Sequence, residues 1–165
     1  MNSTKKLLAV VGSHQVVVVV LPRPGYSKLV TPLIECRSIQ VGQYYHAIKG
    51  SSEIAKVDWH PWSLSASSLM VLTRDANFRE YDISIDSEDP QQSISFVQAA
   101  AMPGSVTNQQ FSNKSKGFSA DDERSTECVS FDIGRGDSDW GPLTLYGLMK
   151  NGDVFAICPF MPNNA

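Results

Sequence analysis

The chain contains three histidines, His14, His46 and His60, which are the first candidates for acid–base or metal chemistry. A serine hydrolase would need a Gly-x-Ser-x-Gly elbow and a zinc peptidase a His-Glu-x-x-His pair, and the sequence contains neither. Asp58 lies two residues before His60, so on a strand the two would share a face. Without a nucleophile or metal set, we interpret this pair as hydrogen-bonded locally or to a neighbouring sheet. The sequence therefore predicts no catalytic, metal-binding or cofactor-binding residue.

Other short motifs also favour a structural interpretation. Cys36, Cys128 and Cys158 are an odd number at long spacings, which fits neither a disulfide framework nor a zinc site and is typical of a reducing compartment. Residues 135–138 read Arg-Gly-Asp-Ser, an integrin-recognition motif, but a Gly-rich loop between strands is the preferred interpretation. Residues 151–153 lack the spaced carboxylates and terminal Glu of a calcium loop and are predicted to form a turn.

Trp59 and Trp62 flank His60 at the end of an expected strand. Tryptophans in such a place more often pack than stack on a ligand. They are therefore assigned to packing, and the sequence assigns no residue to partner binding.

The stretch Ile54–Ile83 organises the chain, because it contains three apolar segments separated by turn residues. Its first segment alternates apolar and polar side chains, as in a half-covered strand, and Pro61 ends it. Leu69–Thr73 is a continuous apolar run, as expected of a strand covered on both faces. The turn candidate Arg74–Asn77 leads into a third strand, Phe78–Ile83. This pattern predicts most of a four-stranded antiparallel sheet, which needs similar sheets beside it.

The same unit recurs downstream. Cys128–Gly134 repeats the alternating strand, and Leu143–Met149 is an apolar central strand. Asn151-Gly152 is a strong hairpin signal, because both central residues of a type I′ turn need φ > 0. Val154–Cys158 then returns as the third strand.

A further hairpin precedes the organising stretch. It consists of Leu7–Val11 and Val16–Leu21, followed by an outer strand at Ile34–Val41. The middle repeat gains an outer strand at Ile94–Gln98. The sequence thus predicts an all-β fold, a partial β-propeller of about three antiparallel blades. The repeats lie approximately at residues 5–42, 53–98 and 126–160 of one domain fragment, 1–165. Residues 103–126, polar and poor in β-branched residues, are predicted to form a mobile loop.

Several of these segments resemble one protein family. The residues are Lys-Val-Asp-Trp-His-Pro-Trp-Ser at 56–63, the Leu-Thr-Arg-Asp turn at 72–75, Tyr81-Asp82 and the Met-Lys-Asn-Gly-Asp hairpin at 149–153. In this order they resemble the N-terminal propeller of the cytoplasmic-face nucleoporins of the fungal Nup82 and animal Nup88 family. The resemblance runs from about Leu7 to Pro162. Members of that family have a complete seven-bladed propeller and a long coiled-coil region, which this chain does not contain.

The resemblance implies a function. Members of the family are non-enzymatic scaffold subunits of the nuclear pore complex on its cytoplasmic filament side, in the nucleus, supporting mRNA export and nucleocytoplasmic transport. Their implied partners are the C-terminal autoproteolytic domain of a Gly-Leu-Phe-Gly nucleoporin and the tail of a Phe-Gly nucleoporin. The alternatives are a generic propeller adaptor with non-nucleoporin partners and a propeller enzyme. The enzyme would need convergent polar groups that the sequence does not offer.

Composition argues against other function classes. The net charge of −3 gives no electrostatic basis for direct binding to nucleic acid or to an anionic membrane surface. The apolar run Val16–Leu21 is far shorter than the ~20 residues needed to span a bilayer. Residues 12–15 interrupt the apolar N-terminal region, which favours a strand over a secretory signal. The sequence thus predicts no membrane insertion.

Three structural expectations follow from the repeat. Leu69–Thr73 and Leu143–Met149 should be among the most buried segments. Trp59 and Phe131 should occupy equivalent places in successive blades and pack between blades. Three repeats are too few to close a propeller, so the terminal blades should each leave an apolar face uncovered and residues 1–165 should be a fragment.

Overall fold

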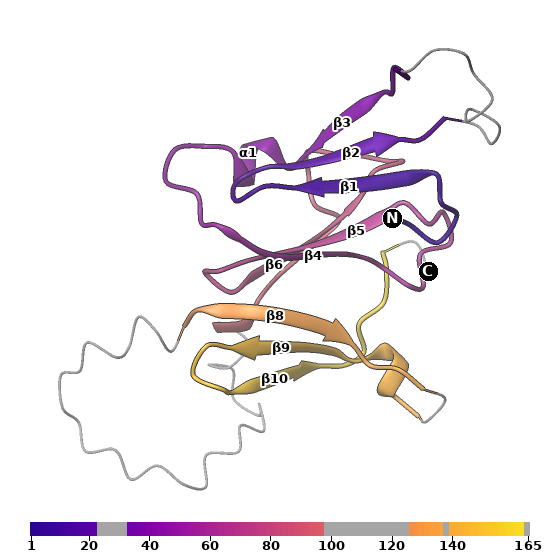
Figure 1. Cartoon of the computed structure of the whole chain (residues 1–165). Coiled ribbons are helices and arrows are strands. Elements are labelled where there is room, and N and C mark those ends of the chain that lie inside the picture. Colours follow the sequence, from indigo (N-terminus) through magenta and orange to yellow (C-terminus); the bar gives the residue numbers. More distant parts are fainter. Residues whose placement is uncertain (23–32, 98–125, 137–138, 164–165) are drawn as a thin grey trace, which may run out of the picture.

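The computed structural model describes residues 1–22, 33–97, 126–136 and 139–163. In these residues three antiparallel sheets follow one another along the chain and are stacked in that order, the first at the top and the third at the bottom of Figure 1. The predicted all-β propeller fragment is confirmed.

The first sheet contains β1 (Leu7–Val11), β2 (Val16–Val20) and β3 (Ser38–Val41), in that spatial order. A run of β-branched valines favours a strand. Val16 and Val18 are buried, whereas the intervening valines are only half-buried. The outer strand is shorter than the predicted Ile34–Val41. A one-turn helix, α1 (Gln43–His46), then leads toward the second sheet.

The second sheet has the four predicted strands, β4 (Ile54–Trp59), β5 (Ser68–Thr73), β6 (Asn77–Asp82) and β7 (Gln92–Ser95). All six residues of β5 are buried. This agrees with the prediction for Leu69–Thr73, because the sheet is packed on both faces. The outer strand lies slightly before the predicted segment Ile94–Gln98.

The third sheet contains β8 (Cys128–Ile133), β9 (Leu145–Met149) and β10 (Val154–Ile157) in the spatial order β10-β9-β8. A short 3₁₀ turn, η2 (Gly141–Leu143), precedes β9. The prediction that Leu143–Met149 is a strand among the most buried segments was wrong in two respects. The strand begins two residues later, and its burial alternates, with Tyr146 and Leu148 about 40% exposed (39% and 40%). No other described segment covers that face.

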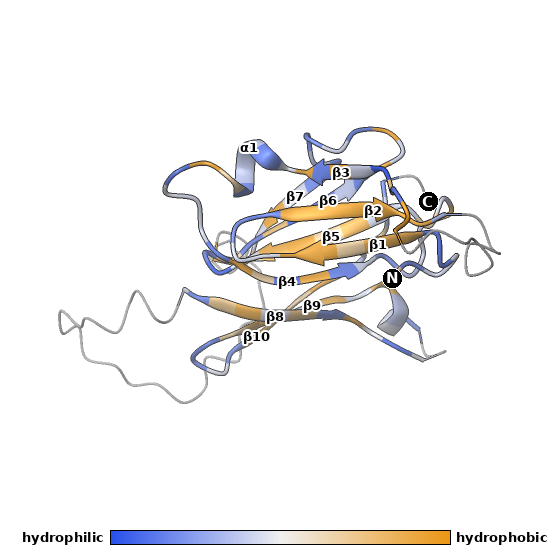
Figure 2. Ribbon diagram, turned by 45° about the horizontal axis from the view of Figure 1, so that its top comes forward, coloured by the Kyte–Doolittle hydropathy of each residue, from blue (hydrophilic) through white to orange (hydrophobic). Residues whose placement is uncertain are grey.

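Two apolar cores hold the stack together. The core between the first and second sheets contains Val16, Val18, Val41, Leu69, Val71 and Tyr81. The core between the second and third sheets is built around Leu72, Phe78, Phe96, Phe131 and Leu145. Figure 2 shows the apolar residues concentrated along β2 and β5, the strands nearest the first of these cores.

The chain after β10 contributes to the second core in a way that the sequence did not indicate. Phe160 is 2% exposed and packs edge-on against Phe78. Its backbone N–H donates to the carbonyl of Leu143 at 2.7 Å. Gln92 of β7 donates its side-chain amide to the carbonyl of Met161 at 2.8 Å. The segment after Ile157 thus crosses back to the second sheet.

The second and third sheets share one register, including a bulge. In β4 the pairing with β5 shifts between Ile54 and Lys56, and in β8 the pairing with β9 shifts between Cys128 and Ser130. The extra residue rotates the strand by one position. Ala55 therefore packs toward the third sheet, whereas Val57 and Trp59 pack toward the first. The prediction of one continuous alternation from Ala55 to Trp59 was wrong for Ala55.

The shared register also corrects the predicted equivalence of Trp59 and Phe131. Val57 pairs with Val71, and Phe131 pairs with Gly147 at the same distance from the bulge. Phe131 is therefore equivalent to Val57, and Trp59 is equivalent to Ile133. Both rings do pack between sheets, but Trp59 is half-buried and lies against the first core, whereas Phe131 is 2% exposed in the second.

The two predicted hairpin turns are confirmed, and they have the same geometry. The N–H of Ala76 donates to the carbonyl of Thr73, and the N–H of Gly152 donates to the carbonyl of Met149, each at 3.0 Å. Ala76 and Gly152 have φ of 62° and 95°. Asn151 is not among the residues with positive φ, so the expected type I′ turn was wrong. Each loop has one left-handed residue after a tight turn, as in hairpins that end in a bulge.

Of the predicted loop 103–126, only Thr126 is among the described residues. Asp137 and Ser138 of the Arg-Gly-Asp-Ser motif also lie outside them. Within the described ranges, no helix is long and apolar enough to cross a membrane.

Candidate functional site

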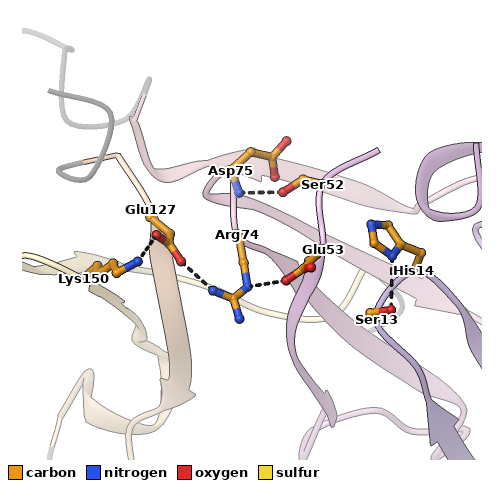
Figure 3. Close-up of polar contacts among 8 residues, drawn as sticks. All are labelled: Ser13, His14, Ser52, Glu53, Arg74, Asp75, Glu127 and Lys150. Carbon is orange, nitrogen blue, oxygen red and sulfur yellow. Dashed lines mark hydrogen bonds and ion pairs between the residues drawn. The ribbon is translucent and has the colours of Figure 1, made fainter. Parts of the chain in front are cut away.

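One end of the sheet stack carries a row of charged side chains, shown in Figure 3. Arg74, in the β5–β6 turn, pairs with Glu53 at 3.0 Å and with Glu127 at 2.7 Å. Lys150, in the β9–β10 turn, reaches Glu127 at 2.5 Å. The cations pull the pKa of the Glu127 carboxyl below its usual range through these hydrogen bonds. Arg74 thereby links the second sheet to the third.

A repeated backbone pattern lies beneath these charges. The N–H groups of Arg74 and Lys150 donate to the carbonyls of Glu53 and Glu127 within their own sheets, both at 2.8 Å. The next residues along the chain, Ile54 and Cys128, donate to the carbonyl of a turn residue in the preceding sheet. Their acceptors are Ser13, at 2.8 Å, and Arg74, at 3.0 Å. This end of the stack is therefore a regular joint between sheets, and we assign it a structural role.

The opposite end of the second and third sheets contains a groove of about 480 Å³. Its apolar lining includes Trp59, Pro61, Trp62 and Pro142. Trp62 is 51% exposed, and its indole N–H donates to the carbonyl of Pro142 at 2.9 Å. This bond fixes the ring across the boundary between the two sheets.

Two carboxylates and one guanidinium also line this groove. Asp58 and Asp132 occupy equivalent places in β4 and β8, and each accepts the N–H of the residue that follows it, at 2.8 and 3.0 Å. The second oxygen of Asp132 lies 3.8 Å from Arg135, whose side chain is 88% exposed. Asp58 forms no ion pair with any described residue. The groove therefore combines aromatic and proline side chains with an acidic balance of charge.

Two of the three histidines, His14 and His46, lie close together, whereas His60 lies elsewhere. His14 is in the β1–β2 turn, and its ring nitrogen is 3.2 Å from the hydroxyl of Ser13. His46 of α1 is fully buried, with its Nε2 atom 3.0 Å from the Tyr81 hydroxyl. Burial, and secondarily the nearby Arg79, lowers the pKa of His46 to about 4. His14 and His46 both line a cavity of about 10 Å³, which has room for one water molecule.

His60 lies one residue beyond β4 and is 4% exposed. Its Nδ1 atom accepts the N–H of Trp62 at 3.1 Å, and its ring stacks on that of Phe160 with 5.2 Å between the ring centroids. Burial lowers the pKa of His60 to about 4. Asp58 is exposed and accepts the backbone N–H of Trp59, whereas His60 accepts that of Trp62. The local hydrogen bonding predicted for both residues is confirmed.

Sequence reasoning missed a buried polar cluster on β6. Glu80 is 1% exposed and accepts hydrogen bonds from the side chains of Ser68 and Gln92. Burial raises the pKa of Glu80, and these two bonds partly oppose it. Asp82 accepts a bond from Ser67 at 2.7 Å. Both carboxylates are buried, and the only available signal was the presence of two acidic residues at alternate positions of one strand.

The remaining motif residues are dispersed. Cys128 is buried, whereas Cys36 and Cys158 are exposed. Within the described residues, no group of three or more His, Cys, Asp or Glu side chains could hold a metal ion. Asn151 and Asp153 bond each other across the β9–β10 turn, at 2.7 and 3.0 Å.

The geometry above matches a known family. The sequence pattern described as "Nucleoporin NUP82 beta-propeller" matches residues 1–164. The chain belongs to this family. Nucleoporin NUP82 of Chaetomium thermophilum is 28% identical over 98% of the chain and 19% of its own length. Nucleoporin nup82 of Schizosaccharomyces pombe is 33% identical, over 72% of the chain and 13% of its own length. Nuclear pore complex protein NUP88 of Arabidopsis thaliana is 27% identical, over 84% of the chain and 15% of its own length.

Solved structures agree with this assignment. A heterotrimeric complex of the Chaetomium thermophilum Nup82 NTD with the Nup159 TAIL and the Nup145N APD matches with a TM-score of 0.78 and 29% identity. The match covers 98% of this chain and 31% of the solved chain. The yeast Nup82-Nup159-Nup116 complex matches with a TM-score of 0.57 at 23% identity, which supports the fold. The chain thus spans less than a fifth of its curated relatives and about a third of the solved chains.

Proposed function

We propose that the chain is part of a scaffold nucleoporin that docks other nucleoporins on the cytoplasmic face of the nuclear pore complex and supports mRNA export. The supporting observation is the match over 98% of the chain to a propeller solved in complex with two nucleoporin segments. The proposed partners are the C-terminal autoproteolytic domain of a Gly-Leu-Phe-Gly nucleoporin and the tail of a Phe-Gly nucleoporin. A rigid stack of sheets that presents many loops suits docking.

Binding to purified partners tests this proposal. The protein is expressed from its full reading frame and mixed with both nucleoporin segments, and the mass of the eluting complex is measured by light scattering. We expect a stable ternary complex, and a fluorescently tagged copy should concentrate at the nuclear rim. Binding to neither segment, together with no rim signal, would overturn the proposal and favour a propeller adaptor with other partners.

We further propose that the repeats at residues 5–42, 53–98 and 126–160 are blades whose outermost faces pack against additional sheets. On the third sheet Tyr146, Leu148 and Val154 are exposed, the last by 61%. On the first sheet Leu8 and Val10, which share the face opposite Leu7 and Ala9, are 37% and 51% exposed. Apolar sheet faces of this kind normally mark an interface.

The state of purified residues 1–165 tests the blade proposal. We expect self-association or binding of a hydrophobic dye, and neither for the product of the full reading frame. A monomer at micromolar concentration that binds no dye and unfolds in one cooperative transition would contradict it.

A further inference from the structure

We propose that the groove between the second and third sheets binds an extended, arginine-bearing segment of a partner protein. The inference rests on the chemistry of the groove lining and is independent of the two partners proposed above. It concerns the end of the stack opposite the charged joint of Figure 3, where loops of both sheets meet.

The walls of the groove suit an aromatic-stacking partner. Trp62 presents a half-exposed ring, and the bond to Pro142 fixes its orientation before any partner arrives. A fixed tryptophan loses little conformational freedom on binding, which is why such residues dominate interface energetics. Trp59, Pro61 and Pro142 extend the apolar wall on either side of the ring. Surfaces lined by aromatic and proline side chains favour extended peptide segments.

The charges of the groove select a cation. Asp58 and Asp132 each use one carboxylate oxygen to accept an N–H of their own strand. Asp132 pairs with the highly exposed Arg135, and Lys56 donates to the carbonyl of the adjacent Phe131. Asp58 forms no ion pair with any described residue. An anionic ligand such as a nucleic-acid phosphate would be repelled by this balance.

Arginine satisfies both features at once. Its planar guanidinium stacks on aromatic faces and binds carboxylates through two parallel hydrogen bonds. Lysine offers a point charge and no plane, so we expect it to bind more weakly. The volume of about 480 Å³ lies in the range of specific ligand sites.

Fluorescence anisotropy with labelled peptides tests the proposal, using the protein made from its full reading frame. The probes are nine-residue peptides with a central arginine flanked by proline and leucine, and matched peptides with lysine, glutamine or glutamate at that position. Affinity should fall in the order arginine, lysine, glutamine, glutamate. Added salt should weaken the arginine peptide most.

Substitutions in the groove locate the binding. Trp62→Ala should weaken the arginine peptide by about tenfold. Asp58→Asn and Asp132→Asn should each weaken it by about threefold and reduce its salt dependence. Matched controls are Trp140→Ala, an exposed tryptophan outside the groove lining, and Asp89→Asn, an exposed carboxylate in the β6–β7 loop. Both should bind as the unmodified protein does.

Three outcomes would overturn the proposal. The glutamate peptide could bind as tightly as the arginine peptide, or no peptide could bind at millimolar concentration. Trp62→Ala could also leave binding unchanged while its thermal unfolding shows a folded protein. A failure here with an intact ternary nucleoporin complex would refute the groove and leave the proposed function standing.

Discussion

Leu72 of the second sheet and Leu148 of the third occupy the same place in the structural repeat. Each lies opposite the residue that follows the bulge, Lys56 in one sheet and Ser130 in the other. Leu72 is fully buried, whereas Leu148 is 40% exposed. The strands, turns and joints are alike, so the difference comes from what covers each face. Local sequence specifies the sheet, and the neighbouring sheet decides which of its residues form a core.

The largest test of this comparison substitutes the two leucines in residues 1–165. Leu72→Ala should lower the free energy of unfolding by about 2–5 kcal/mol, because it leaves a cavity between two sheets. Measured at a concentration low enough to keep the chain monomeric, Leu148→Ala should cost less than about 1 kcal/mol, because its side chain already contacts solvent. Urea denaturation of both variants gives the values. Equal losses would mean that Leu148 is buried in solution.

The second test uses pH, because two buried histidines lie at the borders of the second sheet. Their pKa values fall from the ordinary 6.5 to about 4 in the folded protein. The unfolded chain therefore binds protons first as the pH drops, and stability present above pH 6.5 is lost toward pH 4. At pH 5 each histidine should cost about 2 kcal/mol.

Chemical denaturation at a series of pH values measures this loss. The equivalent of His60 in the third sheet is Gly134. The N–H of His60 donates to the carbonyl of Ser68, and the N–H of Gly134 donates to the carbonyl of Thr144 in the same way. His60→Gln should remove about half of the loss between pH 6.5 and 4, because His46 still titrates. Glu80 acts in the opposite direction, because its raised pKa gives stability that is lost as pH rises through the folded value. A flat profile in the unmodified chain would contradict the assigned burial of both rings.

A third test exchanges side chains between the two sheets. Val57 faces Val71 in the second sheet, whereas Phe131 faces Gly147 in the third. The missing side chain at Gly147 admits the ring of Phe96, which would lie 2.7 Å from an added Cβ atom. Gly147→Val should thus destabilise the chain by about 1–3 kcal/mol or more.

A double-mutant cycle distinguishes overpacking from strand propensity. If the clash with Phe96 causes the loss, Gly147→Val should cost less in a Phe96→Leu background, where the ring is absent. Equal costs in both backgrounds would point to the backbone of β9 instead.

Much of this fold could be predicted from the sequence, because period-2 alternation and turn residues are local signals. The strands at Leu7–Val11 and Leu69–Thr73 and both hairpin turns followed from them. The bulges at Ala55 and Val129 change which face a residue occupies without altering composition, so they left no signal. The burial of Phe160 depends on a return across the second sheet. The groove could not be predicted, because it forms where two loops that are 80 residues apart in the chain meet at Trp62 and Pro142.

The smallest test concerns the two matching turns. Ala76 and Gly152 hold the same left-handed position, with φ of 62° and 95°. An L-residue there costs about 1–2 kcal/mol relative to glycine, whereas glycine costs about 0.5–1 kcal/mol in unfolded-state entropy. Gly152→Ala, with nothing within 4 Å of the added Cβ atom, should therefore destabilise by up to about 1 kcal/mol. Ala76→Gly relieves the same strain, but its methyl group is fully buried in the second core, so the gain should be cancelled or slightly reversed. Thermal unfolding of both variants measures the difference. A clear stabilisation by Ala76→Gly would show that the methyl group adds little to the core, and that the two turns differ in sequence alone.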